Sequence, residues 1–206
     1  MLFIFIIFSI LVTFIGLKNY LIPYLSRNCV DIPNNRSSHI NPVSTGAGIS
    51  FFLTSLIFCS ILGNIQPLIS SPLAIVGFLD DKYGIKKRYR FLTQIFTIFL
   101  IINKFLIFKI YSLGFNNLLN LFIILFLIFA GVAFINFINF MDGIDGLLGN
   151  CAILLILLSI ILNKSYSLLP LVGSLLAFSF FNWNPAKTFM GDCGSTYLAG
   201  ILVSCI

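Results

Sequence analysis

Long apolar runs, separated by short polar segments, make up most of the chain. A helix needs about 20 apolar residues to cross a hydrocarbon core of roughly 30 Å, so each run is a candidate membrane span. The candidate spans run from Leu2 to Leu17, Ile49 to Leu62, Ile65 to Leu79, Phe91 to Phe108, Leu118 to Ile138, Leu147 to Leu162 and Leu168 to Phe181, and a last partial span starts at Thr196. The pattern predicts an all-α, polytopic bundle of about 7–8 transmembrane helices.

The second and third spans are the least regular of these. Only 31 residues, from Ile49 to Leu79, are available for a hairpin that would need about 40. Pro67 and Pro72 fall in its second arm, where proline interrupts a helix. We therefore expect these two spans to be short, tilted or re-entrant. No internal repeat or linker divides the chain, so residues 1–206 are expected to form a single domain.

Composition supports an integral membrane protein. The chain is 59% hydrophobic and 9% charged, with a mean hydropathy of +1.09, whereas a soluble domain has about 25% charged residues. The net charge of +6 resides in the loops between spans, so nucleic acid is not expected as a partner. The five cysteines form no C-x-x-C pair, which predicts neither a disulfide framework nor a zinc site. The first run lacks a basic region and a cleavage site, so it is expected to be a retained span.

The charged residues predict how the bundle is oriented. The side that holds the loop before the second span carries Arg27, Arg36, Lys82, Lys86, Lys87, Arg88, Arg90 and Lys187, and the opposite side carries Lys104, Lys109 and Lys164. The positive-inside rule places the first side in the cytoplasm and the N-terminus outside. The same side receives all six acids, Asp31, Asp80, Asp81, Asp142, Asp145 and Asp192. Because carboxylates are costly near lipid, we expect this face to carry one functional site.

The first acidic segment is G-F-L-D-D-K-Y-G-I-K-K-R-Y-R, which ends at Arg90. Asp80 and Asp81 are adjacent, so their carboxylates repel each other unless a cation or a shared proton intervenes. The basic cluster that follows them could hold phosphate as an electrostatic clamp. The alternative is a solvated loop that obeys the positive-inside rule, which applies to Lys82, Lys86, Lys87 and Arg88.

The second segment, N-F-I-N-F-M-D-G-I-D-G-L, starts at residue 136. Its polar residues Asn136, Asn139, Asp142 and Asp145 recur every third position, which keeps neighbouring groups on one side of a helix end. Gly143 and Gly146 let the backbone turn or approach a ligand closely. Such oxygen ligands suit Mg²⁺, although Asn, Asp and Gly are also ordinary turn residues.

The third segment, F-N-W-N-P-A-K-T-F-M-G-D-C-G-S-T-Y, contains Asp192 between two glycines. Gly191 and Gly194 permit a tight turn, and Ser195 or Thr196 is suited to cap the following helix. Asp192 is then either a site residue or a residue of the cap region.

Five segments together resemble a known family. They are D-I-P-N-N-R-S-S-H-I-N-P at 31–42, G-F-L-D-D at 77–81, R-F-L-T-Q at 90–94, N-F-I-N-F-M-D-G-I-D-G-L at 136–147 and P-A-K-T-F-M-G-D-C-G-S-T at 185–196. In this order they resemble the polyprenyl-phosphate N-acetylhexosamine-1-phosphate transferases, which include the phospho-N-acetylmuramoyl-pentapeptide transferases and the enzymes that initiate O-antigen. The D-x-P-N-x-R-S-S-H form resembles the O-antigen branch, which uses N-acetylglucosamine.

The resemblance implies a reaction and its partners. A UDP-N-acetylhexosamine would transfer its sugar 1-phosphate to undecaprenyl phosphate in the bilayer, with release of UMP. This would occur at the cytoplasmic face of the cell (inner) membrane, with Mg²⁺ as cofactor and Mn²⁺ as an alternative; homodimerisation is left open. The resemblance implies catalytic Asp80, Asp81, Asp142 and Asp145, metal ligands Asn139 and Asp192, and substrate-binding Asn136, Arg90, Lys86 and Gly143.

The chain also departs from the family. It has P-V-S-T-G-A-G at 42–48 where the family usually has P-T-P-R-G-G-G, so Thr45 replaces a basic residue and Ala47 a glycine. The family continues beyond the equivalent of Ile206 with further spans and a loop rich in His or Arg, so the chain is expected to be truncated at its C-terminus. His39, the single histidine, is expected to be an ordinary loop residue.

Two alternatives to an active transferase remain. The first is an inactive, truncated remnant of such an enzyme. The second is a transporter that uses intramembrane carboxylates for ion coupling, which predicts acids in the middle of the spans.

Overall fold

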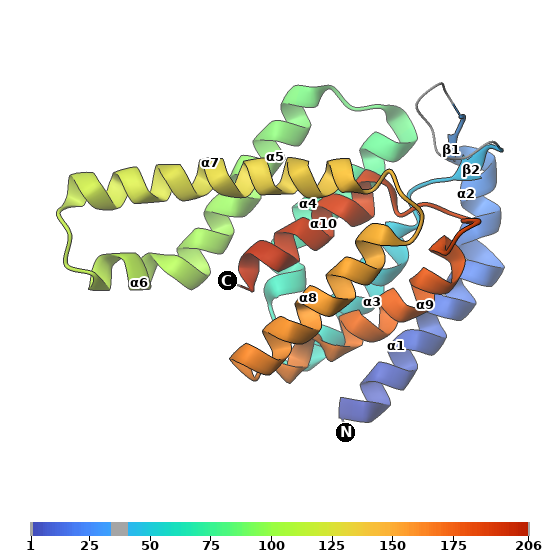
Figure 1. Cartoon of the computed structure of the whole chain (residues 1–206), viewed down its shortest axis with the longest axis horizontal. Helices are drawn as coiled ribbons and strands as arrows, with labels where there is room; N and C mark the ends of the chain where they lie inside the picture. Colours follow the sequence, from blue (N-terminus) through green and yellow to red (C-terminus); the bar gives the residue numbers. More distant parts are fainter. Residues whose placement is uncertain (1, 34–40, 206) are drawn as a thin grey trace.

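A computed structural model of the chain describes residues 2–33 and 41–205. Its helices are α1 (Leu2–Gly16), α2 (Ile22–Asn28), α3 (Gly48–Ile61), α4 (Gln66–Tyr83), α5 (Lys87–Ile101), α6 (Ile107–Ser112), α7 (Asn117–Met141), α8 (Leu147–Asn163), α9 (Leu169–Asn182) and α10 (Gly191–Ser204). They form one bundle (Figure 1), which confirms the predicted all-α membrane architecture. The strands β1 (Val30–Asp31) and β2 (Val43–Ser44) form a short antiparallel hairpin beside it.

Several helices have the length and apolarity that a membrane span requires. Among residues 2–33 and 41–205, three continuous helical segments are long enough to cross a membrane: Leu2–Asn28, Lys87–Ser112 and Asn117–Met141. Three shorter apolar helices are Gly48–Ile61, Leu147–Asn163 and Tyr166–Asn182. The first span is longer than predicted, because a π-helical turn at Leu17–Leu21 joins α1 to α2 without a break. The motif residues 34–40, with Arg36 and His39, lie outside the described residues.

The predicted interruption of the third span by proline is wrong. Pro67 lies in the first turn of α4, where its missing N–H costs no helical hydrogen bond. Pro72 lies inside α4 and leaves the carbonyl of Leu68 without its backbone donor. The hydroxyl of Ser71 donates to that carbonyl at 2.7 Å, so the helix continues to Tyr83.

The last helix begins earlier than predicted. α10 starts at Gly191, so Asp192 lies in its first turn and Ser195 and Thr196 lie inside it. Their hydroxyls donate to carbonyls one turn back, Ser195 to Gly191 at 3.0 Å and Thr196 to Asp192 at 2.7 Å, and therefore do not cap the helix. Gly191 adopts the expected turn conformation with φ +68°, whereas Gly194 is helical. The sequence prediction was wrong because it began the helix at its first long apolar run.

Glycines allow the backbones of neighbouring helices to pack directly against the backbone of the central helix α10. A Cβ on Gly48 of α3 would overlap the backbone of Gly194 and lie 2.8 Å from the Met190 carbonyl oxygen. A Cβ on Gly77 of α4 would lie 2.5 Å from the carbonyl oxygen of Asp192. Small residues drive this kind of close packing between membrane helices. As a result, α10 is buried along most of its length.

The bundle has one acidic end and one projecting arm. The ends of α4 and α7 and the start of α10 lie together (Figure 1), and we call this region the acidic end. At the other extreme, α6 and the first half of α7 project beyond the remaining helices. This half of α7 exposes large apolar side chains, among them Leu118, Phe122 and Phe126, as expected of a lipid-facing surface.

We predict that Gly48→Ala destabilises the protein by about 1–3 kcal/mol, because the added methyl group forces α3 away from α10. Gly16→Ala is the matched control, because a Cβ at Gly16 has no atom within 4 Å. Thermal unfolding in detergent measures both variants. Equal melting temperatures for the two would contradict this account of the α3–α10 contact.

Candidate active site

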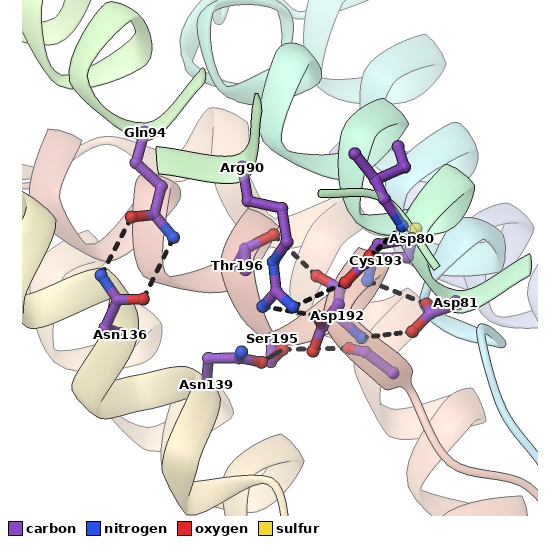
Figure 2. A network of polar contacts seen from close by, with 12 residues as sticks. Asp80, Asp81, Arg90, Gln94, Asn136, Asn139, Asp192, Cys193, Ser195 and Thr196 are labelled. Atoms are coloured by element: carbon purple, nitrogen blue, oxygen red, sulfur yellow. Dashed lines mark hydrogen bonds and ion pairs between the residues drawn. The ribbon is translucent and has the colours of Figure 1, made fainter. Parts of the chain in front are cut away.

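Arg90 connects three helices at the acidic end. Its guanidinium forms ion pairs with Asp80 through Nη1 at 2.6 Å and with Asp192 through Nη2 at 2.5 Å. These residues come from the last turn of α4, the first turns of α5 and the first turn of α10, as Figure 2 shows. The structure thus brings together three residues that the sequence analysis selected.

The turn between α4 and α5 aims Arg90 at the carboxylates. Gly84 ends α4 in the left-handed conformation, with φ +64°, and its N–H donates to the carbonyl of Asp80 at 2.8 Å. The Asp80 side chain accepts a hydrogen bond from the Ile85 N–H at 2.6 Å. Asp80 is therefore held by its own turn as well as by Arg90.

Asp81 points from α4 to the start of α10. Its Oδ1 accepts the N–H of Asp192 at 2.9 Å, and its Oδ2 accepts the N–H of Cys193 at 3.1 Å. Although adjacent in sequence, Asp80 and Asp81 thus have different partners. The predicted repulsion between them is relieved by a guanidinium on one carboxylate and by two backbone N–H groups on the other.

The two asparagines near the end of α7, Asn136 and Asn139, reach different parts of the site. Asn139 accepts a hydrogen bond from the hydroxyl of Ser195 at 2.6 Å, and its side chain also interacts with Asp192. Asn136 forms a reciprocal amide pair with Gln94 of α5, with N···O distances of 2.9 and 3.3 Å. Figure 2 shows this amide pair beside the Arg90 cluster.

The expected single row of Asn136, Asn139, Asp142 and Asp145 holds only for its first half. Helix α7 ends at Met141, so the last two residues no longer follow its periodicity. Asp142 caps the end of α7 and lies within electrostatic reach of Asp81 and Asp192. Asp145 turns away and accepts the N–H of Ala186 at 3.2 Å. Asp145 thus holds the loop before α10 and is not part of the Arg90 cluster.

Burial dominates the electrostatics of the acidic end. It raises the pKa of Asp81 to about 7, even though two backbone N–H groups favour the charged form. Burial also raises the pKa of Asp192; nearby Asp80 adds to this rise and Arg90 opposes it. The pKa of Asp142 is raised by burial and by the charges of Asp81 and Asp192. Several carboxylates therefore share one poorly solvated region.

A polar cavity of about 300 Å³ opens beside the cluster. Its walls are Lys87, Arg90, Phe91, Gln94 and Asn136. Two residues predicted to bind substrate are absent from this set: Lys86 precedes α5 on the exposed surface, and Gly143 lies in the exposed turn after α7. Lys87, rather than Lys86, is thus the lysine that lines the cavity.

The donors at the acidic end fit a hard cation. Within the described residues, no group of three or more His, Cys, Asp or Glu side chains is arranged to hold a metal. Mg²⁺ needs fewer, because it is commonly bound by one or two carboxylates together with water and substrate phosphate. Asp192 of α10 supplies a carboxylate, and Asn139 of α7 has an amide oxygen that accepts from Ser195 while its NH2 group faces Asp192.

Sequence reasoning missed residues that hold the motifs together. Gln94 follows Arg90 by one helical turn, a spacing that could have identified it. Buried Asn182 accepts the Gly146 N–H at 3.1 Å and donates to the Thr188 carbonyl at 3.0 Å, so it joins two motif segments. Nothing in the local pattern distinguishes Asn182 from other polar residues in an apolar helix.

Most of the chain matches a known protein family. The family model described as glycosyl transferase family 4 matches residues 63–206. A phospho-N-acetylmuramoyl-pentapeptide-transferase of Kosmotoga olearia is 49% identical over 41 residues, which are 20% of this chain and 13% of the relative. The corresponding protein of Chlamydia felis is 51% identical over 43 residues, 21% of this chain and 12% of the relative.

The family match covers much more of the chain than the matches to the two relatives. The matched segments of the two relatives are short parts of both proteins, whereas the family match contains the helices α4, α5, α7 and α10 that build the Arg90 cluster. The matched residues 63–206 also include Asp80, Asp81, Asp142, Asp145 and Asp192. On this basis the chain belongs to glycosyl transferase family 4.

Proposed function

We propose that the protein transfers N-acetylhexosamine 1-phosphate from a UDP-sugar to undecaprenyl phosphate and releases UMP. Membership of glycosyl transferase family 4 and the sugar-phosphate transferases among its relatives support this reaction class. The observation that carries the proposal is the position of Arg90, which lies between a polar cavity and the apolar interior.

The polar cavity suits the diphosphate of the sugar donor. Lys87 and Arg90 supply positive charge, and Gln94 and Asn136 supply amide groups. Arginine binds phosphate oxygens through paired N–H groups, and such fixed donors stabilise the charge that develops during phosphoryl transfer. Asp80 and Asp192 hold the guanidinium in place before the substrate arrives.

An apolar groove of about 220 Å³ suits the lipid chain of the acceptor. Its walls are Ile98, Ile102, Leu106, Leu127, Ala130, Gly131, Phe134 and Val203. One side of α5 leads from the ion pairs into the groove. It carries residues at four-residue steps: Arg90, Gln94, Ile98 and, in the turn after α5, Ile102. A polyprenyl chain in the groove would place its phosphate near Arg90.

Asp192 and Asn139 are proposed to hold Mg²⁺, or Mn²⁺ as an alternative. The metal would neutralise the diphosphate as the phosphoryl group is transferred. Ser195 donates to Asn139 and thereby fixes the orientation of its side chain. Asp142, close to Asp192 but outside the ion pairs, is proposed to act on the nucleotide side of the site.

The proposed orientation follows from the charges. Basic residues cluster in the loops at the acidic end, which would place that end in the cytoplasm and the N-terminus outside. In an inner membrane, the site would then face the compartment that contains UDP-sugars and the leaflet that presents the lipid phosphate.

The sugar is proposed to be N-acetylglucosamine, for a glycan such as O-antigen. The first motif supports this choice, whereas the names of the relatives indicate an N-acetylmuramoyl-pentapeptide. Both donors are UDP-N-acetylhexosamines and share the groups that the proposed cavity contacts. An assay with each donor distinguishes the two branches.

The helix ends argue against the transporter alternative. That alternative predicts acids in the middle of spans, yet Asp80 lies in the last turn of α4, Asp142 caps the end of α7, and Asp192 lies in the first turn of α10. An inactive member of the family remains a separate alternative, which the assay below distinguishes from an active one.

We predict that Asp192→Asn lowers transfer by about 10²-fold or more, because it weakens both the proposed metal site and the Arg90 ion pair. Membranes that contain undecaprenyl phosphate and Mg²⁺ are incubated with labelled UDP-N-acetylglucosamine or the labelled UDP-N-acetylmuramoyl-pentapeptide, and butanol-extractable label is counted. Lys164→Gln, at the far end of α8, is the control. No labelled lipid from the unaltered protein with either donor would refute the proposed activity.

We predict that Ala130→Phe raises the KM for undecaprenyl phosphate about tenfold, equivalent to about 1.4 kcal/mol of binding, because the ring fills the apolar groove. The KM for the UDP-sugar should stay unchanged. Leu121→Phe, on the exposed surface of α7, is the control. An equal rise in both KM values would show that the groove does not serve the acceptor alone.

A further inference from the structure

The start of α10 has no capping side chain from its own segment. Its N-cap residue is Met190, whose side chain cannot accept a hydrogen bond from the first turn. The first N–H groups of any helix need acceptors from elsewhere. In α10, the N–H groups of Asp192 and Cys193 donate to the two oxygens of Asp81, which lies 111 residues earlier in the chain.

The surroundings of Asp81 are built around this contact. A Cβ on Gly191 would overlap the Asp81 carboxylate, and a Cβ on Gly46 would lie 3.5 Å from its Oδ2. Gly191 has φ +68°, a conformation that also favours glycine. Gly191 thus leaves space for the Asp81 carboxylate against the α10 backbone, and Gly46 packs beside it.

The segment that leads into α10 is held from a third side. The N–H of Ala47 donates to the Phe189 carbonyl and that of Gly48 to the Met190 carbonyl, both at 3.0 Å. The start of α10 is therefore held between the β2–α3 segment and Asp81. Asp192 lies in the first turn of α10, directly after this segment.

We propose that Asp81 is a positioning residue, which caps α10 and so aligns Asp192 with Arg90 and Asn139, and that it does not itself contact the substrates. This inference rests on the proposed transfer reaction and separates the roles of the adjacent aspartates. Asp80 belongs to the ion-pair cluster, whereas both oxygens of Asp81 are occupied by backbone N–H groups. The negative charge of Asp81 also suits the positive end of the helix dipole.

Conservative replacement tests this role. Asparagine keeps one acceptor oxygen for the N–H groups of α10 but cannot accept the second N–H and cannot act as a base. We therefore expect Asp81→Asn to retain transfer within about tenfold of the unaltered protein, whereas Asp81→Ala loses at least a further tenfold. Gly191→Ala breaks the same contact from the other side. Combined with Asp81→Ala, it should lower activity no further than the more defective single variant.

Alkylation of Cys193 reports on the cap without measuring activity. Its thiol is fully buried and its N–H is one of the two capped donors. Cys151 and Cys205, which are partly exposed, are first replaced by alanine. Asp81→Ala and Gly191→Ala should then speed the reaction of Cys193 with N-ethylmaleimide at least tenfold, whereas Asp81→Asn should not. Buried Cys59 in α3 stays unlabelled unless the whole protein unfolds.

Two results would overturn the inference. One is an Asp81→Asn variant as inactive as Asp81→Ala while Cys193 remains protected, which would make the carboxylate a direct participant. The other is an Asp81→Ala variant with normal Cys193 protection, which would show that the cap does not hold α10. Failure of the proposed transfer reaction is recognised separately, because the unaltered protein would then be inactive while the labelling pattern persisted and supported the cap.

Discussion

The acidic end depends on the compensation of partly buried carboxylates. A charge taken out of water is stable only if ion pairs or hydrogen bonds replace its hydration. Arg90 supplies this for Asp80 and Asp192, and backbone N–H groups supply it for Asp81. Arg90 and these N–H groups lie on different helices from the acids they serve, so the bundle cannot form this region one helix at a time.

Close helix packing makes this compensation geometrically attainable. Gly77 brings the backbone of α4 against the carbonyl of Asp192, and Gly48 brings α3 against Gly194. With larger residues, α10 would stand away from α4, and Asp81 would no longer reach the first N–H groups. The positions of glycine in apolar helices thus bear directly on the polar site, although none of these glycines carries a functional group.

The fold was largely predictable because lipid imposes a simple rule on span length and polarity. The structure confirmed a helical membrane bundle, and most predicted spans differ from the observed helices by a few residues at their ends. The errors occurred where local pairing overrides the general rule: Ser71 satisfies the carbonyl that Pro72 leaves open, and α10 extends into the polar segment at Gly191. Hydropathy cannot detect either effect, since both depend on individual hydrogen bonds.

The sequence by itself determined that the chain is a membrane bundle with its acids at one end, because apolar run length and the spacing of the polar segments do not depend on tertiary contacts. It also selected Arg90, Asn139 and Asp192, which the structure brings together. Only the tertiary structure decided how adjacent Asp80 and Asp81 divide between an ion pair and a helix cap, and that Asp145 faces the loop at Ala186. Those assignments depend on which donor lies across a helix interface, and neither residue type nor spacing along the chain specifies that donor.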